Sequence, residues 1–256
     1  MLIRVAAPSL VGVLALGGLA AAPAAFASTA VKPTIDKASA TSMVFGTTGT
    51  TTFTFSTTVS DDSGIKNVKV TPWPKGVTAP TAGDAGEFAV ATCKASASSA
   101  KTSVCTYTVK TDVRKDFDNT VPGTWYVAAL VTGKDGGTAF AAKAATFTIK
   151  RQDKLTVADG TPEPVKKNAT LTVASKLTRA NWDTYTWQGY GKQSVKLQFL
   201  KSGTKTWTNV KTVSSSTTGA IKTTVKATAS GSWRFVFAGN SVSSAATSAA
   251  DAVTVK

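Results

Sequence analysis

Residues 51–60 read TTFTFSTTVS and place Phe53, Phe55 and Val59 on one side of an extended chain, with Thr and Ser on the other. Because successive side chains of a β-strand point to opposite faces, this period of two predicts a half-buried strand. The same alternation recurs in SVKLQFL (194–200) and SWRFVFAG (232–239). These stretches predict a chain built from β-strands.

The spacing of the strand-like segments indicates how many sandwiches they form. Segments separated by Gly, Ser, Asn and Asp turns follow one another along the chain, and seven of them follow residue 151. Seven short strands in about a hundred residues are typical of an immunoglobulin-like sandwich. The sequence therefore predicts an all-β protein of two tandem immunoglobulin-like β-sandwiches, at residues 28–150 and 151–256, each long enough to bury its own core. Trp207 and Trp233 are predicted core residues of the second.

The first 27 residues have the layout of a secretory signal peptide. Arg4 precedes an apolar run from about Leu10 to Ala22, and Ala25-Phe26-Ala27 follows as a cleavage site. A membrane anchor is the alternative, but the run is shorter than the ~20 residues that a span needs. We therefore expect a secreted protein, extracellular or associated with the cell wall, with no membrane span in the mature chain.

Two cysteines, Cys93 and Cys105, are the only ones in the chain. An even number of cysteines in an exported protein predicts a disulfide. The segments FAVATC and SVCTYTV read as strands with a turn-like stretch between them. The bond is expected to join two neighbouring antiparallel strands across a hairpin.

Histidine is absent from the chain. This excludes a Ser-His-Asp triad, a Cys-His pair and a histidine-ligated zinc site. The sequence therefore predicts a protein that is not an enzyme and needs no cofactor, with calcium as the one option left open.

Positive charge is concentrated in the second half. The net charge is +15, and residues 151–256 hold 15 Lys/Arg against 5 Asp/Glu. Such a surface is attracted to wall phosphate polymers, acidic polysaccharides or extracellular nucleic acid. The alternative is that the lysines keep a β domain soluble and protect its edges. An anionic cell-wall polymer or glycan is the predicted partner, without specific nucleic-acid recognition; no oligomeric state is predicted.

The stretch NWDTYTWQGY (181–190) gathers four aromatic residues, and the predicted ligand-binding set is Trp182, Tyr185, Trp187 and Tyr190. Exposed aromatic rings can stack on the apolar faces of sugars. Alternatively, aromatic residues in an end loop cover the open core of a small sandwich. Both interpretations remain open at this point.

One loop of the first half has candidate metal ligands, namely Asp116, Asp118 and Asn119. Calcium is bound by oxygen atoms from such loops. The neighbouring Arg114 and Lys115 oppose cation binding, and turn formation is the other explanation for these residues.

The second half also resembles a known family. Its V-x-L-x-F strand, G-x-x-x-W turn and closing G-x-W-R-x-x-F-A-G-N segment are similar to bacterial immunoglobulin-like domains of secreted actinobacterial proteins. The matching residues are Val195, Leu197, Phe199, Gly203, Trp207, Gly231, Trp233, Arg234, Phe237, Gly239 and Asn240. The first half is more loosely similar to bacterial immunoglobulin- or cadherin-like modules, through SDDSGI and PGTWYVAALVTGKDGG.

The two-domain layout resembles uncharacterised exported proteins sometimes labelled calcium-binding. The resemblance implies a sandwich and an extracellular address, and supplies no catalytic residues. Taken together, the sequence predicts a secreted, non-catalytic binding or adhesion protein of the cell envelope that holds an anionic or glycan polymer. The alternative is a calcium-binding structural protein.

Overall fold

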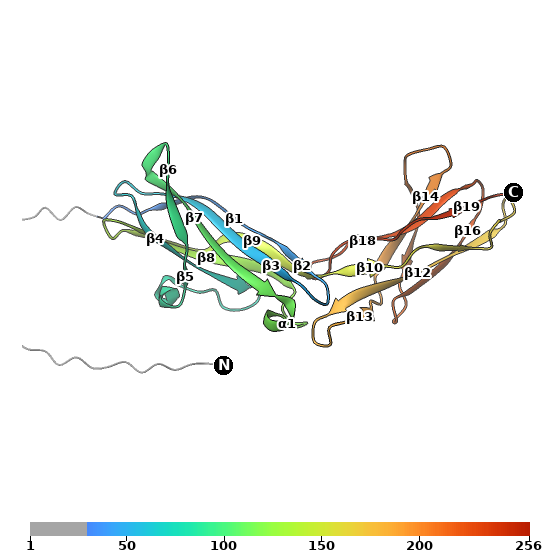
Figure 1. The fold of residues 1–256 in the computed structure, drawn as a ribbon, viewed down its shortest axis with the longest axis horizontal. Helices are drawn as coiled ribbons and strands as arrows, with labels where there is room; N and C mark the ends of the chain where they lie inside the picture. Colours follow the sequence, from blue (N-terminus) through green and yellow to red (C-terminus); the bar gives the residue numbers. More distant parts are fainter. Residues whose placement is uncertain (1–29) are drawn as a thin grey trace, which may run out of the picture.

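The computed structural model describes residues 30–256, so the predicted signal peptide at residues 1–27 lies outside the described part. Almost all regular structure in that part is strand; the exceptions are the short helices η1 (Ala82–Gly86) and α1 (Val113–Asp116). Two β units lie end to end along the long axis (Figure 1). Within residues 30–256, no helix is long and apolar enough to cross a membrane.

The first sandwich has two sheets with the strand orders β1-β3-β7-β6 and β2-β9-β8-β4-β5. The first strand is split between them, since β1 pairs antiparallel with β3 and β2 pairs parallel with β9. This division of strands is that of the immunoglobulin fold. The strands are β1 (Thr34–Ala40), β2 (Met43–Phe45), β3 (Thr50–Ser60), β4 (Ile65–Pro74), β5 (Ala89–Val90), β6 (Thr92–Ser96), β7 (Ser99–Asp112), β8 (Gly123–Gly133) and β9 (Thr138–Arg151).

The core of this sandwich forms where the alternation predicted it. Phe53, Phe55 and Val59 on β3 are all buried. They belong to one apolar cluster with residues of the facing sheet, such as Phe147 of β9, whose ring centroid lies 4.7 Å from that of Phe53. Burial of these rings between the sheets supplies the main stabilisation, at about 1.5–3 kcal/mol for each large apolar side chain.

The second sandwich repeats the plan with a different core. One sheet centres on β12, which pairs with β10, β11, β13 and β16, and the other has the order β15-β14-β17-β18, with β19 also on β17. Leu171, Leu197, Phe235 and Trp233 are buried between the sheets. The strands are β10 (Asp153–Leu155), β11 (Asp159–Thr161), β12 (Thr170–Asn181), β13 (Thr186–Gly189), β14 (Ser194–Lys201), β15 (Thr208–Ser214), β16 (Ala220–Lys226), β17 (Gly231–Phe237), β18 (Ala246–Thr247) and β19 (Asp251–Val253).

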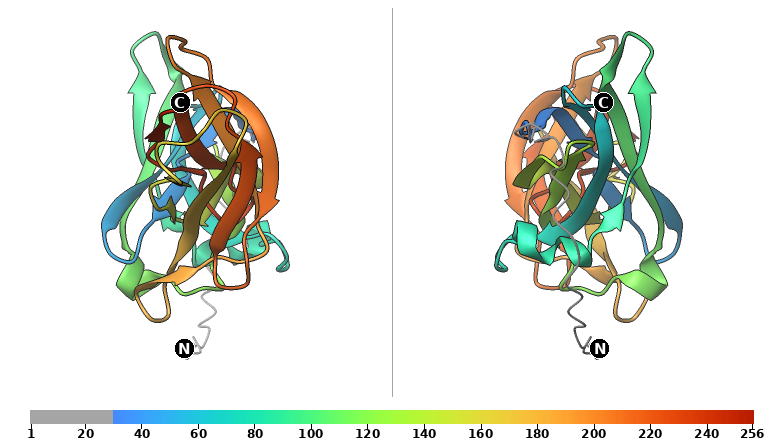
Figure 2. Two further views of the ribbon diagram at one scale, coloured as in Figure 1. Left: turned by 90° about the vertical axis from the view of Figure 1, so that its right-hand side faces the viewer. Right: turned by 90° about the vertical axis from the view of Figure 1, so that its left-hand side faces the viewer.

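Two tandem immunoglobulin-like sandwiches are therefore confirmed as the fold. Viewed along the long axis, one unit lies in front of the other (Figure 2). The predicted domain boundary between residues 150 and 151 stays a prediction; β9 ends at Arg151 and β10 begins at Asp153, with Gln152 between them.

The predicted disulfide is present between Cys93 of β6 and Cys105 of β7. These residues are directly paired across the two antiparallel strands, and their Cα atoms are 4.0 Å apart. The strands form a hairpin at one end of the molecule (Figure 1).

Removing this bond by a double Cys93→Ser/Cys105→Ser substitution is expected to lower the free energy of unfolding by about 3 kcal/mol. Closing a loop of this size restricts the unfolded chain by roughly that amount. Urea unfolding of the oxidised wild type, with the variant beside it, measures the difference. An unchanged midpoint would show that the hairpin is held by its strand pairing alone.

Candidate functional site

The aromatic segment forms a β-hairpin at the joint between the two sandwiches. Strands β12 and β13 pair up to Asn181 and Thr186, and residues 182–185 connect them. Tyr185, the last residue of this connection, has a φ of 55° and so adopts the left-handed backbone conformation. The hairpin points toward the first sandwich and lies beside α1 (Figure 1).

Trp182 is inserted into the core of the first sandwich, although it is part of the second. Its side chain is 0% exposed. The indole Nε1 donates to the carbonyl oxygen of Gly46 at 2.9 Å. The ring lies against Phe45 and Phe117, at centroid distances of 6.1 and 5.6 Å. The prediction that Trp182 stacks on a ligand is therefore wrong for this conformation, because no part of its ring is accessible.

Asn119 brings the predicted metal loop and the aromatic hairpin together. Its side-chain Nδ2 donates to Asn181 Oδ1 at 2.9 Å and to Asp183 Oδ2 at 2.6 Å. Its Oδ1 accepts from the backbone N–H of Trp182 at 3.0 Å. These are two of the sites that the sequence singled out, and they form one contact surface between the sandwiches.

The two acidic members of the predicted metal set have local structural partners. Asp116 accepts the backbone N–H of Asp112 at 2.7 Å. Asp118 accepts both the N–H and the hydroxyl of Thr120, at 2.8 and 2.6 Å. The Thr120 hydrogen bonds lower the pKa of Asp118. Within residues 30–256 no group of three or more His, Cys, Asp or Glu side chains is placed to hold a metal ion. Calcium binding by Asp116, Asp118 and Asn119 stays a prediction.

The other three aromatic residues of the hairpin are partly accessible, and each lies next to a cation. Tyr185 is 37% exposed; the guanidinium of Arg114 lies 5.1 Å from its ring centroid, and its hydroxyl donates to the carbonyl oxygen of Arg114 at 3.0 Å. The half-buried Trp187 has Lys154 Nζ 3.8 Å from its ring centroid. The guanidinium of Arg179 lies 3.8 Å from the ring centroid of Tyr190. Such cation–π contacts orient the rings.

Three charged residues of the joint were not found from the sequence: Arg151, Asp153 and Arg179. Arg151 is 8% and Asp153 4% exposed. The sequence contains a signal for Arg151, because this residue continues the inward-facing alternation of Phe147 and Ile149 along β9. A charge at an inward position of a strand is unusual because burying an unpaired charge is costly.

Burial shifts the pKa values of Asp153 and Arg151. Desolvation raises the pKa of Asp153 to about 7, against the opposing attraction of Arg179 and Arg151. Ser243 and the N–H of Ser244 also favour its ionised form, but no hydrogen bond of normal geometry from residues 30–256 reaches either carboxylate oxygen. Burial likewise lowers the pKa of Arg151, and the positive charge of Arg179 lowers it further.

A polar cavity of about 290 Å3 opens at this joint. Charged and amide side chains from both sandwiches surround it. The lining residues are Asn119, Arg151, Arg179, Ala180, Asn181, Gln188 and Gly189.

A row of hydrogen-bonded polar side chains lies on the outer face of the second sandwich, on β17, β14 and β15. Arg234 Nε donates to Gln198 Oε1 at 2.8 Å, and Gln198 Nε2 donates to Asn209 Oδ1 at 2.8 Å. Arg234 lies 4.0 Å from the ring centroid of Trp207. Trp207 is half-buried and its assignment to the core is wrong, because it precedes the edge strand β15 and packs under a guanidinium.

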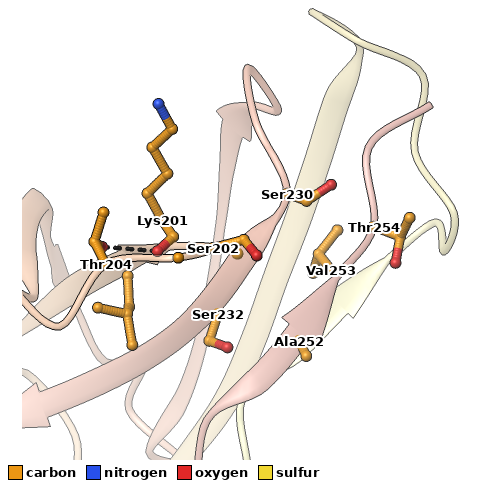
Figure 3. Close-up of a pocket in the computed structure, with 11 residues that line it drawn as sticks. Lys201, Ser202, Thr204, Ser230, Ser232, Ala252, Val253 and Thr254 are labelled. Carbon is orange, nitrogen blue, oxygen red and sulfur yellow. Dashed lines mark hydrogen bonds between the residues drawn. The ribbon is translucent and has the colours of Figure 1, made fainter.

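A shallow pocket of about 250 Å3 lies at the far end of the same sandwich (Figure 3). Hydroxyl groups of Ser202, Ser230, Ser232 and Thr254 surround it, beside Lys201. Thr204 closes one side by donating its hydroxyl to the carbonyl oxygen of Lys201 at 2.7 Å. This pocket has hydroxyl donors but no acid–base pair.

The lysines of the second sandwich are exposed and form no ion pair with the described residues. Each Lys from 154 to 256 is accessible to solvent. Within residues 30–256, the one ion pair is Lys101–Asp62 of the first sandwich, at 2.7 Å. The excess positive charge of residues 151–256 is therefore not neutralised by ion pairs within the described chain.

The solved structures that resemble this chain are distant from it in sequence. The D00–D0 domain of intimin is 11% identical, with coverage of 87% of this chain and 98% of that one and a TM-score of 0.29. The Escherichia coli adhesin FdeC is 15% identical, with 85% and 63% covered and a TM-score of 0.29. Dimeric latent PorU from Porphyromonas gingivalis is 12% identical at a TM-score of 0.30, with 88% of this chain covered but 20% of PorU. Likenesses of this size carry no functional argument.

Sequence comparison reaches only the first sandwich. No curated protein matches the chain. A family model described as a family of unknown function (DUF5707) matches residues 35–131, which run from β1 into β8. The first sandwich is thus similar to a family of unknown function.

Proposed function

We propose that this protein is a secreted, non-catalytic binding or adhesion protein whose basic second sandwich holds an anionic polymer at the cell envelope. The observation that carries the proposal is the uncompensated charge of residues 151–256, with 15 Lys/Arg against 5 Asp/Glu and every lysine exposed. A polymer with regularly spaced negative groups can contact many such lysines at once and release its counterions. The disulfide is consistent with an oxidising compartment.

The aromatic residues left accessible add a second type of contact. Tyr185, Trp187 and Tyr190 remain in the proposed ligand-binding set, while Trp182 is removed from it. A Lys or Arg side chain lies against each of these rings. A ring beside a positive charge suits a sugar unit that bears an acidic group, because the ring can stack on the sugar and the cation can attract the acid.

Co-sedimentation of residues 28–256 with purified cell walls, and with a neutral insoluble polysaccharide, tests the proposal. We expect binding to the walls that weakens steeply as salt is raised, and little binding to the neutral polymer. Equal binding to both materials at high salt would contradict a charge-based partner.

A matched pair of variants locates the binding surface. Replacing Lys196, Lys211, Lys222 and Lys226 with Gln removes four exposed charges from the second sandwich, and replacing Lys37, Lys66, Lys94 and Lys110 removes four exposed charges from the first. The first variant is expected to bind at least about tenfold more weakly and with a smaller salt dependence, and the second to bind like wild type. Equal losses in both variants would mean that net charge alone matters, not the second sandwich.

A further inference from the structure

We infer that the polar cavity at the joint is an oxyanion site, which takes a phosphate, sulfate or carboxylate group between Arg151 and Arg179. This site is separate from the exposed lysines that carry the proposed polymer binding. If the bound group is part of the polymer, the oxyanion site rests on the proposed function and adds a specific contact to it. If the bound group is a free ion, the site does not depend on the proposed function.

Arg151 supplies the main argument, since it is a buried cation with unused donors. The residue is 8% exposed, and its Nε is buried without a hydrogen-bond partner in residues 30–256. One terminal nitrogen, Nη1, donates to Asn119 Oδ1. A guanidinium carries five N–H donors, and buried donors in folded proteins are almost always paired. The remaining donors call for an acceptor in the cavity that Arg151 lines.

Arg179 adds a second positive charge to the same cavity. Its guanidinium lies 3.8 Å from the ring centroid of Tyr190 and donates one hydrogen bond to Ser243 Oγ at 3.3 Å. Two guanidinium groups at one cavity repel each other unless an anion lies between them. Two arginines also match the geometry of phosphate and carboxylate groups, which accept paired N–H donors.

The acidic residues of the joint do not neutralise this pair. Asp153 and Asp183 are near enough to attract Arg151, but neither lies within ion-pair distance of either arginine in the described chain. Both oxygens of Asp183 accept hydrogen bonds from Asn119 instead.

The cavity has the size and lining that an oxyanion needs. Its volume of about 290 Å3 exceeds the roughly 30 Å3 of one water several times over, so a hydrated anion fits. Amide groups of Asn119, Asn181 and Gln188 surround it beside the two arginines. Gln188 is exposed on β13 and places the opening at the surface.

Thermal unfolding of residues 28–256 in increasing inorganic phosphate, against chloride at matched ionic strength, is the first experiment. Binding to the folded state raises the melting temperature with concentration. Phosphate also stabilises proteins generally, so the difference between variants is the signal. We expect Arg179→Gln to lose the specific part of the rise and Lys66→Gln, an exposed control in the first sandwich with the same charge change, to keep it. Equal rises in the wild type and both variants would overturn the site.

A second pair of variants keeps the proposal testable if Arg179→Gln does not fold. Gln188→Glu puts a negative charge at the opening without removing either arginine, and Thr108→Glu makes the same charge change at an exposed position on β7 of the first sandwich, away from the proposed polymer surface. Isothermal titration with phosphate is expected to show binding at least about tenfold weaker for Gln188→Glu alone. Indistinguishable titrations for these two variants and the wild type would contradict the proposal.

The source of the oxyanion is distinguished by repeating the titration with a short poly(glycerol phosphate) chain. Weaker polymer binding by Gln188→Glu, relative to Thr108→Glu, assigns the site to a polymer phosphate. Unchanged polymer binding together with weaker phosphate binding assigns it to a free ion. Because the lysine variants report on the polymer surface independently, failure of the joint site and failure of the proposed function give different results.

Discussion

Replacing Trp182 with Ala is expected to lower the free energy of unfolding by about 3–5 kcal/mol, the usual cost of removing a fully buried tryptophan. The side chain is 0% exposed and packs with Phe45 and Phe117 of the first sandwich. Its removal leaves a cavity and an unpaired carbonyl oxygen at Gly46. Because Trp182 belongs to the second sandwich by sequence, the loss is expected to appear in the unfolding of the first.

Urea unfolding, followed by hydrogen exchange of β2 and β9 amides, measures this effect. Trp207→Ala is the control, because Trp207 is also a tryptophan of the second sandwich but is half-buried on its outer face. We expect the control to lose about 1 kcal/mol or less. Losses of equal size, or a loss confined to the second sandwich, would show that the joint does not stabilise the first.

The same substitution tests whether the joint holds the two sandwiches in one arrangement. Asn119 contacts Asn181 and Asp183 across the joint, and Tyr185 contacts Arg114. These polar contacts surround the Trp182 ring, so its loss is expected to broaden the distribution of interdomain distances in small-angle X-ray scattering. A distribution unchanged from wild type would mean that the hydrogen bonds alone fix the arrangement.

Replacing Asp153 with Asn is expected to stabilise the protein in a pH-dependent way. The pKa of Asp153 is raised to about 7 by burial, from 3.8. Between these values the folded state binds the proton more tightly than the unfolded state, so stability contributed by protonated Asp153 is present at low pH and lost as the pH rises through about 7. Asparagine remains neutral and avoids this loss.

The difference in unfolding free energy between Asp153→Asn and wild type is therefore expected to grow between about pH 4 and pH 8. Its upper limit is about 4 kcal/mol, since each pKa unit corresponds to about 1.4 kcal/mol. Asp159→Asn, at an exposed carboxylate of the same sandwich, is the control and is expected to show no comparable trend. A difference that stays constant with pH would indicate that ionised Asp153 is well compensated in the joint.

Much of the fold was predictable from local pattern. The alternation of Phe53, Phe55 and Val59 placed a strand whose inner face is buried, and the same argument succeeded for SVKLQFL and SWRFVFAG. The disulfide followed from two cysteines on adjacent strand-like segments. Each of these inferences concerns residues that are close in the chain, where a period of two or a turn decides the geometry.

The candidate site was only partly predictable. The sequence singled out the aromatic segment and the loop with Asp116, Asp118 and Asn119, but treated them as two unrelated sites. Trp207 was assigned to the core because tryptophans are usually buried, whereas its place beside an edge strand leaves it under Arg234. Arg151 is not among the predicted site residues, although it lies on the same inward-facing side of β9 as Phe147 and Ile149.

By itself the sequence determined an all-β chain, two sandwiches and a strongly basic second half, because strand periodicity, turn residues and charge are properties of neighbouring positions. Only the tertiary structure decided that Trp182 completes the core of the other sandwich and that Asn119 meets Asn181, 62 residues later. Only it decided that Arg151 and Arg179 face one cavity. These contacts depend on how two separately formed sandwiches meet. Contacts of that kind arise from packing between distant segments, and no local pattern encodes them.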